Sequence, residues 1–257
     1  MIKAVFIDFD GTLYSHYTER IPDSAVKAVK MMQENGIKVF LCTGRSLYEL
    51  KGFDLGGIKF NGIIGNNGQL AYDENGKELI NTPIEGKLKD FIIDFFNSKT
   101  VPIIFNTTDR MFSNYVDDEM IKILADINTP APEAKPYERE DIYMCSAFYN
   151  NQERWSELMS IKDIANITYW HTGGVDIVPK SSTKAIAVEK VISMYDIKQE
   201  ETMAIGDSEN DIQLLKYCEI GVAVGNGVDE VKEAADYITG HIDEDGIYNA
   251  CKHFNLI

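Results

Sequence analysis

The sequence predicts an α/β fold, in which a Rossmann-like core with a parallel sheet carries an inserted α+β cap domain. Strand-like and helix-like segments alternate through the first third of the chain, and the same alternation returns near the C-terminus. Between these two parts the order of helix and strand patterns is different. Such alternation is typical of parallel sheets covered by helices on both faces. We therefore assign residues 1–81 and 180–257 to the core, and residues 82–179 to the inserted cap domain.

The opening third supplies three strands and the helices between them. An apolar run at residues 2–8 predicts a buried strand, and an amphipathic pattern predicts a helix from Pro22 to Gly36. A second apolar run at 37–43 predicts the next strand. We expect residues 44–53 to be helical and residues 61–68 to form a short strand that ends in turn residues.

The C-terminal part repeats this order, and the insert mixes helix and strand patterns. The predicted core elements are a helix at 183–197, a strand at 201–207, a helix at 209–218 and a strand at 220–225. The insert has helical patterns at 85–99 and 117–127, and strand patterns at 101–107, 110–116, 143–150 and 167–172. Residues 128–141 hold three of the seven prolines, which predicts a surface connection.

Composition limits the classes of function. At 257 residues and 44% hydrophobic composition the chain can bury a sizeable core, but its formal net charge of −16 argues against nucleic-acid partners and anionic membrane surfaces. The four cysteines form no C-x-x-C pair, and no stretch approaches the roughly 20 apolar residues of a membrane span. We expect a cytoplasmic protein with reduced thiols, either a monomer or a homodimer.

Two carboxylates follow the first predicted strand. Asp8 and Asp10 flank Phe9, and side chains two residues apart on a strand point the same way. They therefore lie at the carboxyl end of the sheet, where ligands bind in open α/β folds. Two ionised carboxylates this close repel each other, and a cation relieves the repulsion. The alternative is a plain strand-to-turn transition, because Asp-Gly is a common turn pair.

Two more residues add a hydroxyl group and a positive charge. Thr43 follows the second strand directly, where its hydroxyl and the nearby backbone N–H groups are suited to a phosphate oxygen. Lys184 stands at the start of a helix, where the helix dipole favours anions. A phosphate shared with Thr43 explains this placement, and a solvated surface lysine is the alternative.

A third acidic group lies in the segment AIGDSENDIQLL. Asp207 ends a strand, Asp211 follows four residues later, and Asn210 stands between them at a helix N-terminus. A plain N-cap would explain Asp207 but not Asp211, which adds negative charge beside the first pair. About four oxygens at one sheet edge make a site for a hard cation such as Mg²⁺. Together with Lys184 and Thr43, the set favours a phosphoryl group as ligand.

The ordered motifs resemble the haloacid dehalogenase (HAD) superfamily: DFDGT at 8–12, a strand-final T-G-R at 43–45, Lys184, and G-D-x-x-N-D at 206–211. Only the stretch between Thr43 and Lys184 leaves space for a domain. That insertion point, with the segments GNNG, GVAVGNG and AADYITGHIDEDGI, resembles the Cof-like, sugar-phosphatase-like branch. The resemblance covers the core and the C-terminal tail. The cap resembles the family only in its insertion point and in its mixture of strand and helix patterns, not in its residues.

The resemblance implies a Mg²⁺-dependent phosphatase that forms an aspartyl-phosphate on Asp8, with Asp10 as general acid and base. The implied metal site comprises Asp8, Asp10 through its backbone carbonyl, Asp207, and Asp211, which alternatively orients Lys184. The implied phosphoryl site comprises Thr43, Gly44, Arg45, Lys184 and Asn210, of which Arg45 could equally form a surface ion pair and Asn210 could contact the metal.

The expected partner is a small phosphorylated metabolite, either a sugar phosphate or a phosphorylated cofactor. We expect the cap to select it, and the residues to inspect first are Arg110, Tyr115, Trp170 and His171, each of which also suits a core or turn position. Two other functions stay open. A phosphomutase of the same superfamily would use the same intermediate, and a non-catalytic sensor would bind the phosphate ligand without turnover.

Overall fold

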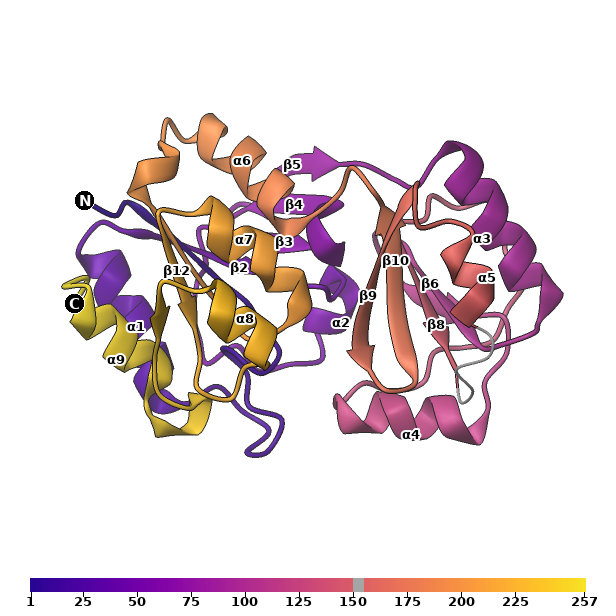
Figure 1. Ribbon diagram of the computed structural model, residues 1–257, viewed down its shortest axis with the longest axis horizontal. Helices are drawn as coiled ribbons and strands as arrows, with labels where there is room; N and C mark the ends of the chain where they lie inside the picture. Colours follow the sequence, from indigo (N-terminus) through magenta and orange to yellow (C-terminus); the bar gives the residue numbers. More distant parts are fainter. Residues whose placement is uncertain (150–154) are drawn as a thin grey trace. The chain divides into compact units, whose positions relative to one another are not determined.

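The first strand, β1 (Ala4–Ile7), lies near the middle of an eight-stranded sheet in the computed structural model, which describes residues 1–149 and 155–257 (Figure 1). All four β1 residues are fully buried, because helices cover both faces of the sheet. The spatial order of the strands is β13 (Tyr237–Ile238), β12 (Ile220–Ala223), β11 (Thr202–Gly206), β1, β2 (Lys38–Cys42), β3 (Gly62–Gly65), β4 (Leu70–Asp73) and β5 (Glu78–Asn81).

Neighbouring strands from β13 to β3 run parallel, and β4 turns back antiparallel to β3. In β1, Ala4 is in register with Thr202 of β11 and Lys38 of β2. Strands β1, β2 and β11 therefore end at the same edge of the sheet. This register brings the residues that follow the three strands close together.

Five helices of the described chain accompany this sheet: α1 (Asp23–Glu34), α6 (Lys184–Met194), α7 (Ile212–Tyr217), α8 (Asp229–Ala234) and α9 (Gly246–His253). Helices α6, α7 and α8 pack over the face that holds Phe6 and Phe40, and α1 packs with α9 (Figure 1). Helix α1 ends at Glu34, and Gly36, the residue predicted to close it, follows its C-cap. Gly36 has a φ of +81°, and the next residue, Ile37, donates back to the carbonyl of Met32, which closes a Schellman motif.

The second sheet is antiparallel and has the order β7 (Met111–Ser113), β6 (Ile103–Asn106), β8 (Met144–Phe148), β10 (Gly174–Pro179) and β9 (Ala165–His171). Helix α3 (Gly86–Ser98) packs on one face through Ile92 and Phe96, and α4 (Asp118–Asp126) packs on Ile104 of the other face. The short helix α5 spans Trp155–Met159. Residues 128–141 connect these elements without a helix or strand, as predicted.

The chain forms two compact units. Unit 1 comprises Met1–Gly44, Phe53–Ile80 and Thr183–Ile257, and unit 2 comprises Arg45–Gly52 and Asn81–Ser182. The expected ranges 1–81 and 180–257 differ from unit 1 chiefly at 45–52, which groups with unit 2. In the described part of the chain, no helix combines the length and the apolar character that crossing a membrane requires.

The helix expected over residues 44–53 is much shorter, and this prediction is wrong in its extent. Helix α2 covers only Leu47–Leu50, because Ser46 is its N-cap and exchanges hydrogen bonds with Glu49 in a capping box. The strand expected at 143–150 corresponds to β8, and its last residue, Asn150, lies outside the described residues.

Candidate active site

Asp8 and Asp10 follow β1 at the carboxyl edge of the parallel sheet. The Asp8 amide still donates to the Ile205 carbonyl of β11, at 2.9 Å, so the sheet fixes its backbone. The Asp8 side chain is buried, with 6% exposure, whereas the Asp10 side chain is one-third exposed. The two carboxylates therefore occupy different environments: Asp8 is held inside the protein, and solvent reaches Asp10.

Lys184 is buried between two carboxylates. Its Nζ lies 2.5 Å from Asp8 Oδ1 and 2.7 Å from Asp211 Oδ1, and its side chain is only 1% exposed. Thr183 forms the N-cap of α6 and fixes the start of this helix. Burial by itself would lower the pKa of Lys184, but the two carboxylates outweigh it and raise the pKa. The alternative of a solvated surface lysine is therefore wrong.

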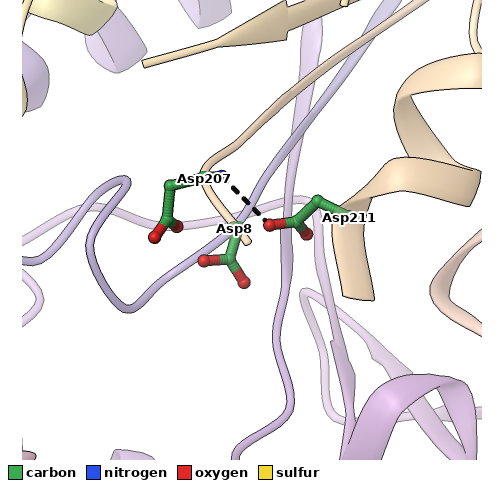
Figure 2. Close-up of side chains that lie close together, drawn as sticks. All are labelled: Asp8, Asp207 and Asp211. Atoms are coloured by element: carbon green, nitrogen blue, oxygen red, sulfur yellow. Dashed lines mark hydrogen bonds between the residues drawn. The ribbon is translucent and has the colours of Figure 1, made fainter. Parts of the chain in front are cut away.

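Asp207 and Asp211 come from the end of β11 and the turn that follows it. Asp211 Oδ2 accepts hydrogen bonds from the backbone amides of Asp207 and Ser208, at 3.1 and 3.2 Å (Figure 2). Ser208, not Asp207, is the N-cap of the turn Glu209–Asp211, so the plain N-cap alternative for Asp207 is wrong. The Asp207 carboxylate instead accepts a 2.7 Å hydrogen bond from the Thr12 hydroxyl.

The loop after β1 closely approaches the Asp207 carboxylate. Gly11 has a φ of +75°, and a Cβ at this position would lie 2.6 Å from Asp207 Oδ2. A larger residue would therefore clash with the carboxylate and strain the backbone. This close approach gives the Asp-Gly pair a role beyond that of an ordinary turn.

Three neighbouring carboxylates form a candidate metal site, of which Asp8 and Asp211 are buried and Asp207 is half-buried. Asp8, Asp207 and Asp211 each offer an oxygen within 4.8 Å of the others (Figure 2). Burial and the neighbouring carboxylates raise the pKa of Asp8 well above its usual range, and burial together with Asp211 raises that of Asp207 to about 7. Three carboxylates against one ammonium leave surplus negative charge, so this donor set fits a hard cation.

Thr43, Gly44 and Asn210 lie around Asn67, which follows β3. Thr43 is fully buried and its carbonyl accepts from the Asn67 amide at 3.2 Å. A Cβ on Gly44 would lie 3.3 Å from Asn67 Oδ1. The same Oδ1 accepts from Asn210 Nδ2 at 3.0 Å. The structure thus brings together Asn67 and Asn210 from loops 143 residues apart.

Comparisons with known proteins identify the family. The profile of haloacid dehalogenase-like hydrolases matches residues 5–251. The chain belongs to this family. YkrA of Bacillus subtilis (strain 168) is 31% identical over 258 residues, which cover 99% of this chain and 98% of YkrA. The 5-amino-6-(5-phospho-D-ribitylamino)uracil phosphatase YcsE of the same organism is 29% identical over 260 residues, with 99% and 96% covered.

A solved structure extends the match to three dimensions. The sugar phosphatase BT4131, of HAD subclass IIB, superposes with a TM-score of 0.87 at 32% identity, covering 99% of this chain and 100% of BT4131. These comparisons confirm the predicted HAD family, its Cof-like branch and the α/β core with an inserted domain. They also confirm an enzyme of the phosphatase class.

Arg45, the remaining residue of the HAD motif segment, belongs to unit 2. Its side chain is 5% exposed, and its guanidinium donates to the Thr129 hydroxyl at 2.6 Å and to the Ile127 carbonyl at 2.7 Å. The structure therefore gives Arg45 partners at the C-terminal end of α4. The alternative of a surface ion pair is wrong for this buried residue.

Three of the four cap residues singled out for specificity have partners within unit 2. Arg110 forms a 2.7 Å ion pair with Glu140, and the Trp170 indole donates to Asp176 at 3.0 Å and packs edge-on against Phe148. His171 lies 3.4 Å from Asp126 of α4. These contacts agree with structural roles for the three residues within unit 2.

Sequence reasoning missed three residues that contact the HAD motifs. Thr12 donates to Asp207, Asn226 donates to the Gly11 carbonyl at 2.6 Å, and His16 lies 2.9 Å from Asp10. Thr12 and Asn226 stand in segments that the resemblance already used, DFDGT and GVAVGNG, so these segments carried a usable signal. No sequence signal pointed to His16, because its proximity to Asp10 depends on a tight turn.

Proposed function

We propose that this chain is a Mg²⁺-dependent phosphatase that hydrolyses small phosphate monoesters through an aspartyl-phosphate on Asp8. The observation that carries the proposal is the position of the Lys184 ammonium, 2.5 Å from Asp8 and 2.7 Å from Asp211, inside a cluster of three carboxylates. A carboxylate that must attack an anionic phosphoryl group needs positive charge beside it. Lys184 supplies one such charge, and the remaining carboxylates suit a cation that supplies more.

The cation would be held by Asp8, Asp207 and the backbone carbonyl of Asp10. Asp211 already accepts from Lys184 through Oδ1 and from two backbone amides through Oδ2, which supports the role of orienting Lys184. When bound, Mg²⁺ supplies charge that offsets the phosphoryl oxygens and the clustered carboxylates. Raised pKa values at Asp8 and Asp207 support a cation there, since they reflect carboxylates in excess of positive charge.

In the first transfer, an Asp8 oxygen forms a bond to phosphorus while the bond from phosphorus to the leaving oxygen breaks. Asp10 gives its proton to that leaving oxygen, and its partial exposure supports this role because the substrate must reach it. Thr43, Gly44, Lys184 and Asn210 bind the phosphoryl oxygens in this proposal. Arg45 is the least supported member of the set, because Thr129 and Ile127 engage its guanidinium.

In the second transfer, water attacks phosphorus and the bond to Asp8 breaks. Asp10, now ionised, takes a proton from the water, and inorganic phosphate leaves. Both halves use one aspartate as nucleophile and another as proton carrier. The buried position of Asp8 and the partly exposed position of Asp10 are consistent with this division of roles.

The proposed substrate class is a sugar phosphate or a phosphorylated cofactor. YcsE is named for a phosphorylated ribitylamino-uracil and BT4131 for a sugar phosphate, and both are similar to this chain over nearly its whole length. The shared chemistry is a phosphate monoester of a polyhydroxylated alcohol. Such a leaving group departs poorly without a proton, which is the task proposed for Asp10.

The test is to assay purified protein with Mg²⁺ against p-nitrophenyl phosphate and a panel of sugar and cofactor phosphates. We expect the wild type to release inorganic phosphate. In Asp8→Asn, kcat should fall by about a thousandfold or more, because this variant removes the proposed nucleophile. Asp23→Asn is the matched control, since the Asp23 side chain is 90% exposed on α1. An isomerised sugar phosphate without free phosphate would indicate a mutase, and binding without turnover would indicate a sensor.

A further inference from the structure

The loop after β1 folds back so that His16 returns to Asp10. The Tyr14 amide donates to the Phe9 carbonyl at 2.7 Å, and the Gly11 amide donates to the Tyr14 carbonyl at 3.0 Å. Ser15 and Arg20 then pair antiparallel, through two backbone hydrogen bonds of 3.0 and 3.3 Å. His16 therefore stands directly after a tight turn and at the start of a small hairpin, a position defined by backbone hydrogen bonds.

Aromatic packing also restrains the His16 ring. The ring meets Tyr14 edge-on, with centroids 5.4 Å apart and an interplanar angle of 76°. Tyr14 is in turn buried against Phe9 and Phe53, at 5.2 and 4.9 Å between centroids. Edge-to-face contacts of this kind favour one ring orientation. The imidazole is thus held from one side by unit 1 itself.

The other side of the ring faces the Asp10 carboxylate. His16 Nε2 lies 2.9 Å from Asp10 Oδ1, a distance at which a ring N–H donates to a carboxylate oxygen. A neutral imidazole with its proton on Nε2 and an imidazolium can both make this donation. The side chains are 25% and 33% exposed, so the pair is accessible to solvent and to a substrate.

We propose that His16 is a positioning residue for Asp10. By donating to Oδ1 it holds the Asp10 carboxyl in one orientation towards the leaving group. A positioned proton donor is more effective than a rotating one, because less orientational freedom is lost in the transition state. The inference rests on the proposed function, in which Asp10 is the general acid and base.

Two variants separate the donor from the packing. His16→Phe keeps an aromatic ring against Tyr14 and removes the N–H, whereas His16→Gln keeps an N–H donor and removes the ring. The substrates are p-nitrophenyl phosphate, whose leaving group hardly needs a proton, and the sugar phosphate that the wild type hydrolyses fastest. Tyr17→Ala is the matched control in the same hairpin, because Tyr17 is 91% exposed.

We expect His16→Phe to lower kcat for the sugar phosphate by about tenfold, which is the value of a hydrogen bond to a charged group, and KM to change little. The loss for p-nitrophenyl phosphate should stay below about twofold. His16→Gln should recover most of the activity. In an Asp10→Asn background, His16→Phe should have no further effect, because the group that it positions is gone.

Three results would overturn the inference: equal losses for both substrates, a full additional loss in the Asp10→Asn background, or wild-type rates in His16→Phe. The proposed function fails differently. If Asp10→Asn slows hydrolysis of the two substrates equally, Asp10 is not the general acid. If Asp8→Asn stays active, Asp8 is not the nucleophile. Thermal unfolding of each variant identifies a loss of activity that comes from a loss of folding.

Discussion

At the scale of single residues, Lys184 supplies the positive charge that stabilises the buried carboxylates of Asp8 and Asp211. Its ammonium contacts Asp8 and Asp211, and all three side chains are at most 6% exposed. A buried charge that loses its partner is strongly destabilising, because neither water nor an opposite charge compensates it. The same argument makes Lys184 a structural residue as well as a proposed phosphate ligand.

We predict that Lys184→Met destabilises the metal-free protein by about 3–5 kcal/mol, the usual cost of breaking a buried ion pair. Urea unfolding at pH 7 with a chelator present measures it. Lys198→Met is the control, because that lysine is 73% exposed in its pair with Glu200 and should leave the unfolding midpoint unchanged. Wild-type stability in Lys184→Met would contradict the buried pair.

Of the four carboxylates predicted to share one site, the structure brings Asp8, Asp207 and Asp211 together, and their surroundings could be predicted only in part. Asp8, Asp207 and Asp211 could be predicted to converge because each stands at or just after the end of a parallel strand. The contacts of Arg45 with Thr129 and Ile127 could not be predicted from the sequence, because the residues are more than 80 positions apart and no periodicity links them. The same holds for His16, whose approach to Asp10 depends on a turn.

At the scale of elements, the loop between β12 and α8 connects the two segments that follow β1 and β11 and carry the proposed site residues. Asn226 donates to the Gly11 carbonyl at 2.6 Å and accepts from the Ile242 amide at 2.9 Å, and the Val228 amide donates to the Asp207 carbonyl at 2.9 Å. One loop therefore holds the segment after β1 and the segment after β11. The relative positions of Asp8 and Asp207 depend on it.

We predict that Asn226→Ala lowers the free energy of unfolding by about 1–3 kcal/mol, because it leaves two backbone groups without their partners. Activity should fall beyond what the lost stability explains. Asn249→Ala provides the comparison: that amide also donates to a carbonyl, of Glu244, but in an exposed position. Similar losses of activity in the two variants would show that the loop does not position the two segments.

Glu140 joins elements of unit 2 and makes its stability depend on pH. Lys135 and Arg110 lie 2.6 and 2.7 Å from Glu140 Oε1, and the Glu138 amide donates to Oε2. Partial burial would raise the pKa of Glu140, but these hydrogen bonds lower it to about 2. A lowered folded-state pKa gives stability that is present above the unfolded pKa near 4.5 and is lost as pH falls towards 2.

We therefore predict that Glu140→Gln costs about 1 kcal/mol between pH 7 and pH 5, after allowance for solvent screening, and progressively less below pH 4.5. Urea unfolding of both proteins across this range measures the difference. Glu138→Gln, at the more exposed end of the same cluster, should change stability little at any pH. A difference that grows as pH falls would contradict the assigned sign.

Elements with a clear apolar pattern could be predicted from the sequence, and elements without one could not. The helices at α1, α3 and α6 and the strands β1, β2 and β11 follow clear apolar patterns. Strands β4 and β5, with the sequences LAYD and ELIN, include polar residues and are only partly buried, so they show no apolar run. Strand β10 starts at a glycine, ends at a proline and buries Asp176 in its centre, which hides the strand pattern.

At the scale of the whole molecule, the formal charge of −16 affects every ionic interaction. Acidic residues outnumber basic ones by 41 to 25, so an anionic substrate is repelled at long range. Surface charges beyond a Debye length of about 8 Å are largely screened at physiological salt. Local positive charge at Lys184 and at the proposed cation then decides whether a phosphate ester binds.

Because the protein is strongly acidic, a test for Mg²⁺ binding needs NaCl of equal ionic strength as its control. Any salt stabilises a strongly acidic protein somewhat by screening, whereas a bound cation stabilises it by mass action at one site. We predict that Mg²⁺ at ten times its dissociation constant stabilises the wild type by about 1.4 kcal/mol over NaCl of equal ionic strength. Asp207→Asn should lose this increment and keep the general effect of salt, since it removes one carboxylate of the cluster. Thermal unfolding of both proteins in the two salts measures it, and equal stabilisation of the wild type by NaCl and Mg²⁺ would mean that Asp8 and Asp207 hold no cation.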